Sequence, residues 1–151
     1  KGVDLRLHVP RDLPRLQVDP VKFRQIVLNL VSNGIKFTDR GGRIEIDAEL
    51  AADGGFLFQI ADNGCGMDPA DIPKALAPFV QLSNGQKLGH GGTGLGLPLV
   101  KSLVELHGGM MQVKSARGRG TVVTVKFPAN RVGRSPERAS ARVPESGGVA
   151  A

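Results

Sequence analysis

The sequence lacks Trp and Tyr entirely and contains a single Cys among its 151 residues. Six Phe are too few to form an aromatic surface on which nucleic acid bases stack. One thiol, Cys65, excludes an internal disulfide and a zinc site built from clustered cysteines. A lone cysteine fits a reducing environment, so we expect a cytoplasmic setting.

Long apolar runs are also missing from this sequence. No stretch approaches the roughly 20 apolar residues that a membrane span needs, and the first residues do not resemble a signal peptide. We therefore expect no membrane contact by this chain, although a longer parent protein could be membrane-anchored. The sequence starts at Lys1 without Met, and we expect it to be part of a longer protein.

Charge is present but dispersed. The formal net charge is +6, yet Lys and Arg are scattered rather than clustered, so no nucleic acid partner is expected. Residues 131–151 are rich in Arg, Ser, Pro, Gly and Ala, with almost nothing to bury. We interpret residues 1–130 as one catalytic or binding domain and residues 131–151 as a disordered basic tail, which we favour over a DNA-binding arm.

Hydrophobic periodicity predicts an α+β fold. The predicted strands are residues 3–9, 43–50, 56–62, 110–116 and 121–127. The predicted helices run from Pro20 to about Ile35, over a short segment opened by Asp68-Pro69, and from Leu95 to Leu106, with a glycine-containing loop between Pro78 and Gly94. We expect a two-layer sandwich in which about three helices cover one face of a mixed, mostly antiparallel sheet.

Two asparagines mark the first long helix. At 100° per residue, Asn29, Asn33 and Lys36 lie on one side, and apolar residues lie on the other. This polar side could simply be a solvated helix face. Alternatively, a neutral amide oxygen is a suitable ligand for Mg²⁺ when phosphates and water supply the other ligands. The residues alone leave both interpretations open.

A carboxylate ends the third predicted strand, in the stretch Asp62 to Met67. Asp62 could accept a hydrogen bond from an exocyclic amine such as the N6 group of adenine. Gly64 and Gly66 would let the backbone approach a flat ligand or adopt positive φ. The alternative is a turn in which the Asp side chain bonds its own backbone, with Cys65 as a small bystander.

Glycines also precede the last predicted helix, at positions 91, 92, 94 and 96. A glycine-rich loop at a helix N-terminus suits phosphate binding. Residues 89–94 match G-x-G-x-x-G, but no strand precedes them, which excludes a dinucleotide fold, and no P-loop motif is present. Pro98 is compatible with the helix only if the helix begins near Gly94 to Gly96.

Taken together and in order, these motifs resemble the catalytic ATP-binding domain of sensor histidine kinases, which shares the Bergerat ATP-binding fold with gyrase, Hsp90 and MutL. The matching segments are NLVSNGIKFT (29–38, N box), DNGCGM (62–67, G1 box), PFVQ (78–81, F box), GTGLGL (92–97, G2 box) and GTVVTVKFP (120–128). The resemblance covers about residues 3–128. Gly34 and Pro98 replace residues that are more usually Ala, and neither change removes a ligand.

The resemblance assigns roles to particular positions. It implies that ATP and Mg²⁺ are bound by Asn33, Asp62, Gly64, Gly66, Phe79, Gly92, Thr93, Gly94, Leu95, Gly96 and Thr121, with Asn29 and Lys36 as catalytic side chains. Asn33 would hold the metal and Lys36 would approach the phosphates. Asp62 would bind the adenine amine, with Thr121 supporting it through water and both glycines under the base. Phe79 would anchor a mobile lid over residues 81–92.

The resemblance also bears on the reaction. Hydrolases of this superfamily carry a Glu base four residues before the metal-binding Asn, and here that position is Asn29, which cannot accept the proton. We therefore expect phosphoryl transfer to a histidine on a helical dimerisation and phosphotransfer domain of the same parent protein, and indirectly to a response regulator. A pseudokinase-type binding module, or an ATP hydrolase, stays as the alternative.

The chain carries three histidines of its own, His8, His90 and His107. None lies on a long amphipathic helix of the kind that carries the phosphoacceptor in this family. His107 precedes Gly108-Gly109 and is expected to cap the last helix. We therefore expect that this chain does not phosphorylate itself.

Overall fold

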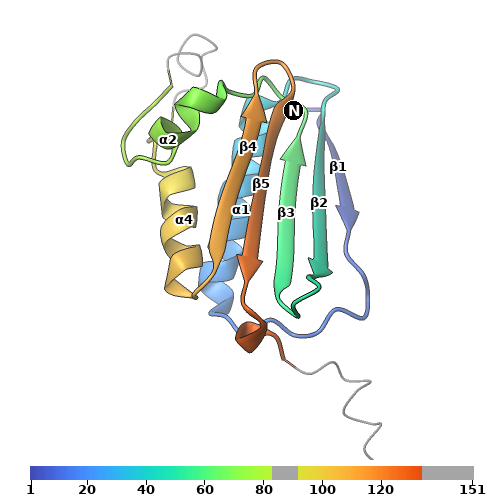
Figure 1. Ribbon diagram of the computed structural model, residues 1–151. Helices are drawn as coiled ribbons and strands as arrows, with labels where there is room; N and C mark the ends of the chain where they lie inside the picture. Colours follow the sequence, from blue (N-terminus) through green and yellow to red (C-terminus); the bar gives the residue numbers. More distant parts are fainter. Residues whose placement is uncertain (83–91, 134–151) are drawn as a thin grey trace, which may run out of the picture.

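The computed structural model describes residues 1–82 and 92–133 and has two layers (Figure 1). The strands are β1 (Asp4–His8), β2 (Arg43–Leu50), β3 (Phe56–Asp62), β4 (Met110–Ala116) and β5 (Gly120–Phe127). The helices are α1 (Pro20–Phe37), α2 (Ile72–Ala75) and α4 (Gly96–Leu106), with short 3₁₀ turns at Pro69–Asp71 and Ala129–Arg131. In the described part of the chain, no helix has the length and apolar character needed to cross a membrane.

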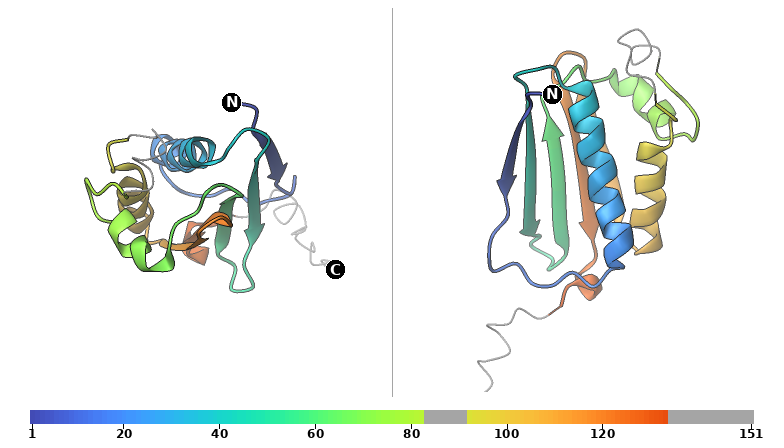
Figure 2. Two further views of the ribbon diagram at one scale, coloured as in Figure 1. Left: turned by 90° about the horizontal axis from the view of Figure 1, so that it is seen from above. Right: turned by 180° about the vertical axis from the view of Figure 1, so that it is seen from behind.

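The five strands form one sheet in the order β1-β2-β3-β5-β4. β1 runs parallel to β2, and every other neighbouring pair is antiparallel. The helices lie on one face of this sheet, and β1 forms the edge away from them (Figure 2). The predicted two-layer sandwich with a mixed, mostly antiparallel sheet is therefore confirmed.

Helix α1 begins where the sequence predicts and ends two residues later than expected. The Asp19 carboxylate accepts hydrogen bonds from the backbone N–H groups of Val21 (2.9 Å) and Lys22 (3.2 Å), and Pro20 occupies the first turn. This cap satisfies N–H groups that have no partner within the helix. The helix buries Ile26 and Leu30 against the sheet, so its polar side is turned away from the core.

The core follows the period-two alternation of the strands. Its buried residues are Ile26, Leu30, Ile44, Ile46, Ala48, Phe56, Phe58, Ile60, Val100, Leu103, Val104, Val123, Val125 and Phe127. On the helix-covered face, β2, β3 and β5 each contribute every second residue to this set, and Met111 and Val113 of β4 pack against it partly buried. The alternation reaches polar residues at one end of the sheet, at Asp62 of β3, Thr121 of β5 and Ser115 of β4, and this end carries the candidate site.

The last helix confirms two expectations. α4 starts at Gly96, so Pro98 lies in its first turn, where a missing N–H costs nothing. His107 is its C-cap and is buried. The His107 Nδ1 lies 2.8 Å from the Leu103 carbonyl, and the Nε2 accepts the Asp19 N–H at 3.2 Å, which links the end of α4 to the start of α1.

The ordered part of the chain extends past the predicted domain boundary at residue 130. We expected the disordered tail to start at residue 131, but Arg131 to Gly133 pair with residues 15–17. Val132 forms a bridge with Leu16, and the Gly133 N–H donates to the Arg15 carbonyl at 2.7 Å. Val132 also packs against the core, a contact that the Arg-rich composition of the segment conceals. The rest of the predicted tail, and residues 83–91 of the predicted lid, lie outside the described residues.

Candidate functional site

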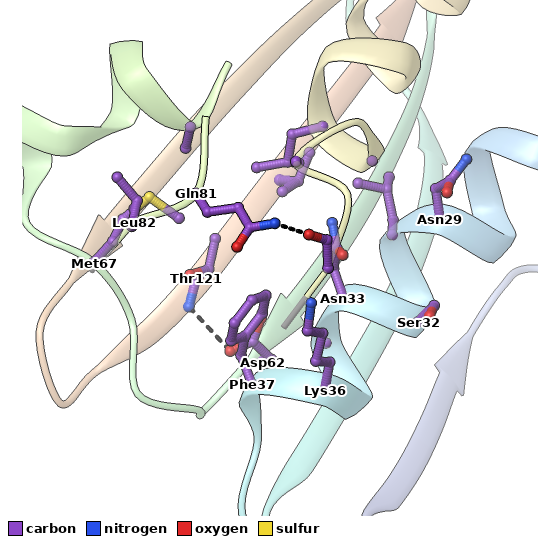
Figure 3. Close-up of a pocket in the computed structure, with 18 of the residues that line it drawn as sticks. Asn29, Ser32, Asn33, Lys36, Phe37, Asp62, Met67, Gln81, Leu82 and Thr121 are labelled. Carbon is purple, nitrogen blue, oxygen red and sulfur yellow. Dashed lines mark hydrogen bonds between the residues drawn. The ribbon is translucent and has the colours of Figure 1, made fainter. Parts of the chain in front are cut away.

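A cavity of about 310 Å³ opens between α1, the ends of β3 and β5, and the segment that leads into α4. Figure 3 shows Asn33 and Lys36 of α1 and Asp62 and Thr121 of the sheet around this cavity. Ten of the predicted site residues line it: Asn29, Asn33, Lys36, Asp62, Gly66, Gly92, Thr93, Gly94, Gly96 and Thr121. Four segments far apart in the sequence thus meet at one place.

The α1 wall presents two amides. The Asn29 Nδ2 donates to the Gln25 carbonyl at 3.0 Å, which leaves the Asn29 Oδ1 as an acceptor. No side-chain hydrogen bond is found for Asn33 within residues 1–82 and 92–133, and a Cβ on Gly96 would approach its Nδ2 to 3.2 Å. Both side chains are half-buried and line the cavity, so this side of α1 is not a simple solvated face.

Lys36 brings a cation to the same wall. Its ammonium lies 5.0 Å above the Phe37 ring and has no ion-pair partner in the described ranges. It also lies close to the backbone of Gly92, because a Cβ built on Gly92 would come within 2.3 Å of the Lys36 Nζ. Any side chain at position 92 would therefore displace this charge. The geometry leaves Lys36 available to an anion.

The N-terminus of α4 lies beside Asn33, because a Cβ built on Gly96 would come within 3.2 Å of the Asn33 Nδ2. Leu95 is its N-cap and supplies no side-chain hydrogen bond, so the first N–H groups of the helix have no capping partner. Pro98 has no N–H, which confines these donors to Gly96 and Leu97. Backbone donors and the helix dipole at such an end favour a phosphate group.

The two carboxylate oxygens of Asp62 have different surroundings. Its Oδ1 accepts the N–H of Gly64 at 3.0 Å, which is the predicted side-chain-to-backbone turn. The same oxygen accepts the N–H of Thr121 at 3.3 Å, as Figure 3 shows. The other oxygen, Oδ2, has no hydrogen bond among the described residues. It is therefore left to accept a donor from a bound molecule.

Burial raises the pKa of Asp62, and the hydrogen bonds from the Gly64 and Thr121 N–H groups oppose that rise. Burial also raises the pKa of the Cys65 thiol, with the Asp62 charge as the next cause. Cys65 lines the cavity but stays protonated, in agreement with its expected role as a bystander rather than a nucleophile.

Backbone crossings explain why the two G1 glycines are needed. A Cβ on Gly64 would lie 2.2 Å from the carbonyl oxygen of Phe37, and one on Gly66 would lie 2.0 Å from the carbonyl oxygen of Ala116. Gly66 also has φ of +61°. These contacts are with backbone, which cannot move aside cheaply. Gly66 forms part of the cavity wall, whereas Gly64 is buried and does not line it.

Two further predicted residues do not line the cavity. Leu95 occupies the N-cap position of α4, and Phe79 is turned to solvent, with 77% of its surface exposed. The Phe79 backbone nevertheless joins the two ends of the lid segment, because its N–H donates to the Gly94 carbonyl at 3.2 Å. Its φ of +63° is unusual for a non-glycine residue. The Gln81 side chain adds a hydrogen bond to the Gly92 carbonyl (Figure 3).

Sequence reasoning missed most of the apolar wall. The additional lining residues are Leu30, Ser32, Gly34, Phe37, Ile60, Cys65, Met67, Ala75, Val80, Gln81, Leu82, Leu97, Pro98 and Val123. Leu30, Ile60 and Val123 also belong to the core. Their periodicity marks them as buried but does not show that one edge of each faces a cavity. A mostly apolar lining with a few fixed polar groups is typical of a small-molecule site.

The cavity offers neutral amide oxygens as ligands for a metal ion, rather than a cluster of charged side chains. No group of three or more His, Cys, Asp or Glu side chains that could hold a metal occurs in the described ranges. The residues present fit Mg²⁺, which keeps several waters and needs only one or two protein ligands when phosphates are bound. The unpaired Asn33 amide can supply such a ligand.

Known proteins resemble this chain in sequence. The family model of histidine kinase-, DNA gyrase B- and HSP90-like ATPases matches residues 18–131. An uncharacterized sensor-like histidine kinase of Rhizobium meliloti is 43% identical over 145 residues, which are 95% of this chain and 27% of that protein. The histidine protein kinase DivJ of Caulobacter vibrioides is 41% identical over 127 residues, 84% of this chain and 21% of DivJ. The chain thus spans about a quarter of the length of these relatives.

Solved structures share the fold. Full-length ShkA in complex with AMPPNP is similar with a TM-score of 0.75 and 29% identity, over 89% of this chain and 27% of ShkA. The mycobacterial sensor histidine kinase MprB is similar with a TM-score of 0.70 and 26% identity, over 84% of this chain and 82% of the solved chain.

Proposed function

Since this chain belongs to the family of histidine kinase-, DNA gyrase B- and HSP90-like ATPases, as the ATP-binding catalytic domain of a sensor histidine kinase, we propose that its cavity binds ATP with Mg²⁺. In this proposal the γ-phosphate passes to a histidine on a helical domain outside this chain. That helical domain belongs to the parent protein and in turn serves a response regulator.

The adenine is proposed to lie at the sheet end of the cavity. Asp62 keeps one oxygen for two backbone N–H groups and offers the other to the exocyclic amine. Ile60 and Val123, paired neighbours on β3 and β5, give this end of the cavity an apolar wall that suits a flat ring. ShkA was solved with an ATP analogue, which supports the same class of ligand for this chain.

The phosphates are proposed to lie between α1 and the N-terminus of α4. Mg²⁺, held by Asn33 and phosphate oxygens, would neutralise charge on the transferring group. Lys36 and the N–H groups of Gly96 and Leu97, which have no capping side chain among the described residues, would stabilise the remaining negative charge. Such transfer depends mainly on positioning and charge neutralisation, and the cavity offers both.

Asn29 determines which acceptor is proposed. An amide cannot remove a proton from water, so the wall of α1 has no general base at this position. A neutral imidazole nitrogen attacks with its own lone pair and needs no base. As the new N–P bond forms, the bond from the γ-phosphorus to the bridging oxygen breaks, and ADP leaves. Asn29 Oδ1, which accepts no hydrogen bond within residues 1–82 and 92–133, would orient this nucleophile.

The observation that carries the proposal is a single cavity with the Asp62 carboxylate in one wall and the Asn33 amide in another. The test mixes the chain with γ-labelled ATP and Mg²⁺, with and without the helical histidine domain of the parent protein. We expect label on that domain's histidine and negligible phosphate release from the chain alone. Steady release by the chain alone would favour the hydrolase, and binding without transfer would favour the pseudokinase module.

A further inference from the structure

A row of polar side chains crosses three neighbouring strands at the sheet end of the cavity. Strand pairing sets Asp62 of β3 opposite Thr121 of β5, and Thr121 opposite Ser115 of β4. The preceding row on the same face is entirely apolar. Ser115 does not line the cavity, so no ligand contact explains its presence in the polar row.

One arrangement of hydroxyl protons satisfies every hydrogen bond of Ser115. Its Oγ lies 2.8 Å from the Met67 nitrogen, whose N–H can only donate, and 2.9 Å from the Gly120 carbonyl oxygen, which can only accept. Ser115 therefore accepts from Met67 and gives its single proton to Gly120.

Either hydroxyl could donate in the third contact of Ser115, and the arrangement that satisfies all its partners makes Thr121 the donor. The Ser115 Oγ and the Thr121 Oγ1 are 2.8 Å apart. Because the Ser115 proton is already committed to Gly120, Thr121 is the donor in this pair. The Thr121 hydroxyl consequently presents only lone pairs to the cavity.

This arrangement makes the polar edge of the cavity an edge of acceptors. Asp62 accepts through its free Oδ2, and Thr121 accepts through its oriented hydroxyl. A 6-amino purine brings N–H donors at position 6 to that edge, directly or through a water. A 6-oxo purine instead brings a carbonyl oxygen, which is an acceptor, against the acceptors Asp62 and Thr121. A buried acceptor left without a donor loses affinity.

We propose that Ser115 is a positioning residue that holds Thr121 as an acceptor and thereby sets the preference of the cavity for 6-amino over 6-oxo purine nucleotides. This inference rests on the proposed function, since it needs the purine at Asp62. Removing the Ser115 hydroxyl frees the Thr121 proton to turn into the cavity and pair with a 6-oxo group.

The experiment is a calorimetric titration of the full chain with ATP and with inosine triphosphate, both with Mg²⁺. We expect Ser115→Ala to lower the ratio of ATP affinity to inosine triphosphate affinity by about fivefold. Ser115→Thr, which restores a hydroxyl, should keep the wild-type ratio. Ser102→Ala, on the exposed side of α4 and outside the cavity, is the matched control.

Each outcome has a distinct meaning. An unchanged ratio in a folded Ser115→Ala protein overturns the role of Ser115 alone, provided that the wild type prefers ATP. A wild-type chain that does not discriminate between the two nucleotides overturns the purine placement in the proposed function. Should Ser115→Ala fail to fold, Ser115→Cys retains the volume with a weaker hydrogen-bonding group, and an unchanged ratio there also overturns the role.

Discussion

At the scale of single residues, ligand binding and burial favour opposite protonation states of Asp62. Its carboxylate is placed where binding needs a charge, while burial disfavours that charge and raises the pKa. Conversion to Asn keeps an oxygen for the Gly64 and Thr121 N–H groups but turns an N–H₂ donor toward the cavity. Recognition and stability should therefore respond in different directions to the same substitution.

We predict that Asp62→Asn lowers ATP affinity by about 10- to 100-fold, the size expected for losing a hydrogen bond to a charged group. Isothermal titration calorimetry with ATP and Mg²⁺ measures this loss, and thermal unfolding of the unliganded variant establishes that it is folded. Wild-type affinity in a folded variant would show that Asp62 does not bind the purine.

The pH dependence of stability follows from the raised pKa of Asp62. Below the ordinary carboxyl pKa of about 3.9, both the folded and the unfolded chain hold the proton. As the pH rises, the unfolded chain ionises first, so the free energy of unfolding contributed by Asp62 falls until the pH passes the raised folded pKa. Relative to Asp62→Asn, the unliganded wild type should therefore lose stability across that window.

Thermal unfolding of both proteins over a range of pH measures this difference. The two proteins differ only at position 62, and Cys65, whose pKa the Asp62 charge affects, keeps its proton throughout this acidic window. A constant difference between the two melting temperatures across the window would contradict the raised pKa.

Cys65 offers a direct report on where the nucleotide binds, because it is the only thiol in the chain and lines the cavity. Burial raises its pKa, so alkylation by iodoacetamide at neutral pH should be slower than that of a free cysteine. We predict that ATP with Mg²⁺ slows it further, and that Asp62→Asn loses this protection at the same ATP concentration. Mass spectrometry follows the modified fraction, and equal rates with and without ATP would place the nucleotide elsewhere.

At the scale of elements, the turn after β3 is held tightly against the end of α1. Gly64 is buried, and a Cβ there would lie 2.2 Å from the Phe37 carbonyl oxygen, so the two backbones cannot separate without moving the helix end. Lys36 and Asn33 belong to this end of α1, which links the fit of one glycine to the cavity wall.

We predict that Gly64→Ala lowers the free energy of unfolding by about 1–3 kcal/mol through overpacking, and weakens ATP binding as well. Gly118→Ala is the control, because Gly118 has a φ of +72° with no atom within 4 Å of an added Cβ. This control should lower the free energy of unfolding by about 1–2 kcal/mol, the strain of an alanine in the left-handed backbone region, and leave ATP affinity unchanged. Denaturant unfolding and calorimetry compare the two, and intact ATP binding by Gly64→Ala would contradict the coupling.

The sequence predicts elements and motif residues well because both rest on local patterns. Asp19 and Pro20 start α1 by capping chemistry, and the alternation over β2 and β3 sets which side chains face the helices. Properties that depend on distant contacts are not predictable in this way. The exposed side chain of Phe79 and the pairing of Val132 with Leu16 come from the tertiary structure.

The same distinction between local patterns and distant contacts applies to the residues of the site. Asn33 and Asp62 are predictable because motifs carry them, and their common cavity follows from the resemblance. Ser115 is not, since a serine in an alternating strand looks like any polar position. Its importance comes from strand register, which sets it beside Thr121 and could not be known before the sheet order.

At the scale of the whole molecule, the described histidines are far from the transfer chemistry. His107 is buried at the C-terminal end of α4, and that helix has its other end at the cavity. Eleven residues at 1.5 Å each separate the two ends by about 16 Å. His8 lies on β1, the edge strand, and its Nδ1 pairs with Asp47 at 3.1 Å.

We therefore predict that the chain alone, incubated with γ-labelled ATP and Mg²⁺, gains no acid-labile phosphate. Gel autoradiography before and after acid treatment measures this, with the added helical histidine domain as the positive control. His90 lies outside the described residues, so His90→Ala is the variant to examine should the chain become labelled. Acid-labile label on the chain would contradict the separation of the acceptor from this chain, and its loss in His90→Ala would identify His90 as that acceptor.

The polar row of Asp62, Thr121 and Ser115 has a consequence for assembly of the sheet. Only one alignment of β3, β5 and β4 puts these three side chains next to each other on the same face. A slip of β5 by a single residue would rotate Thr121 to the opposite face and bring Val122 inward. A chain with such a slip would lose the proposed contacts of Asp62 and Thr121 with the base, so nucleotide binding would report that the sheet has formed in the correct register.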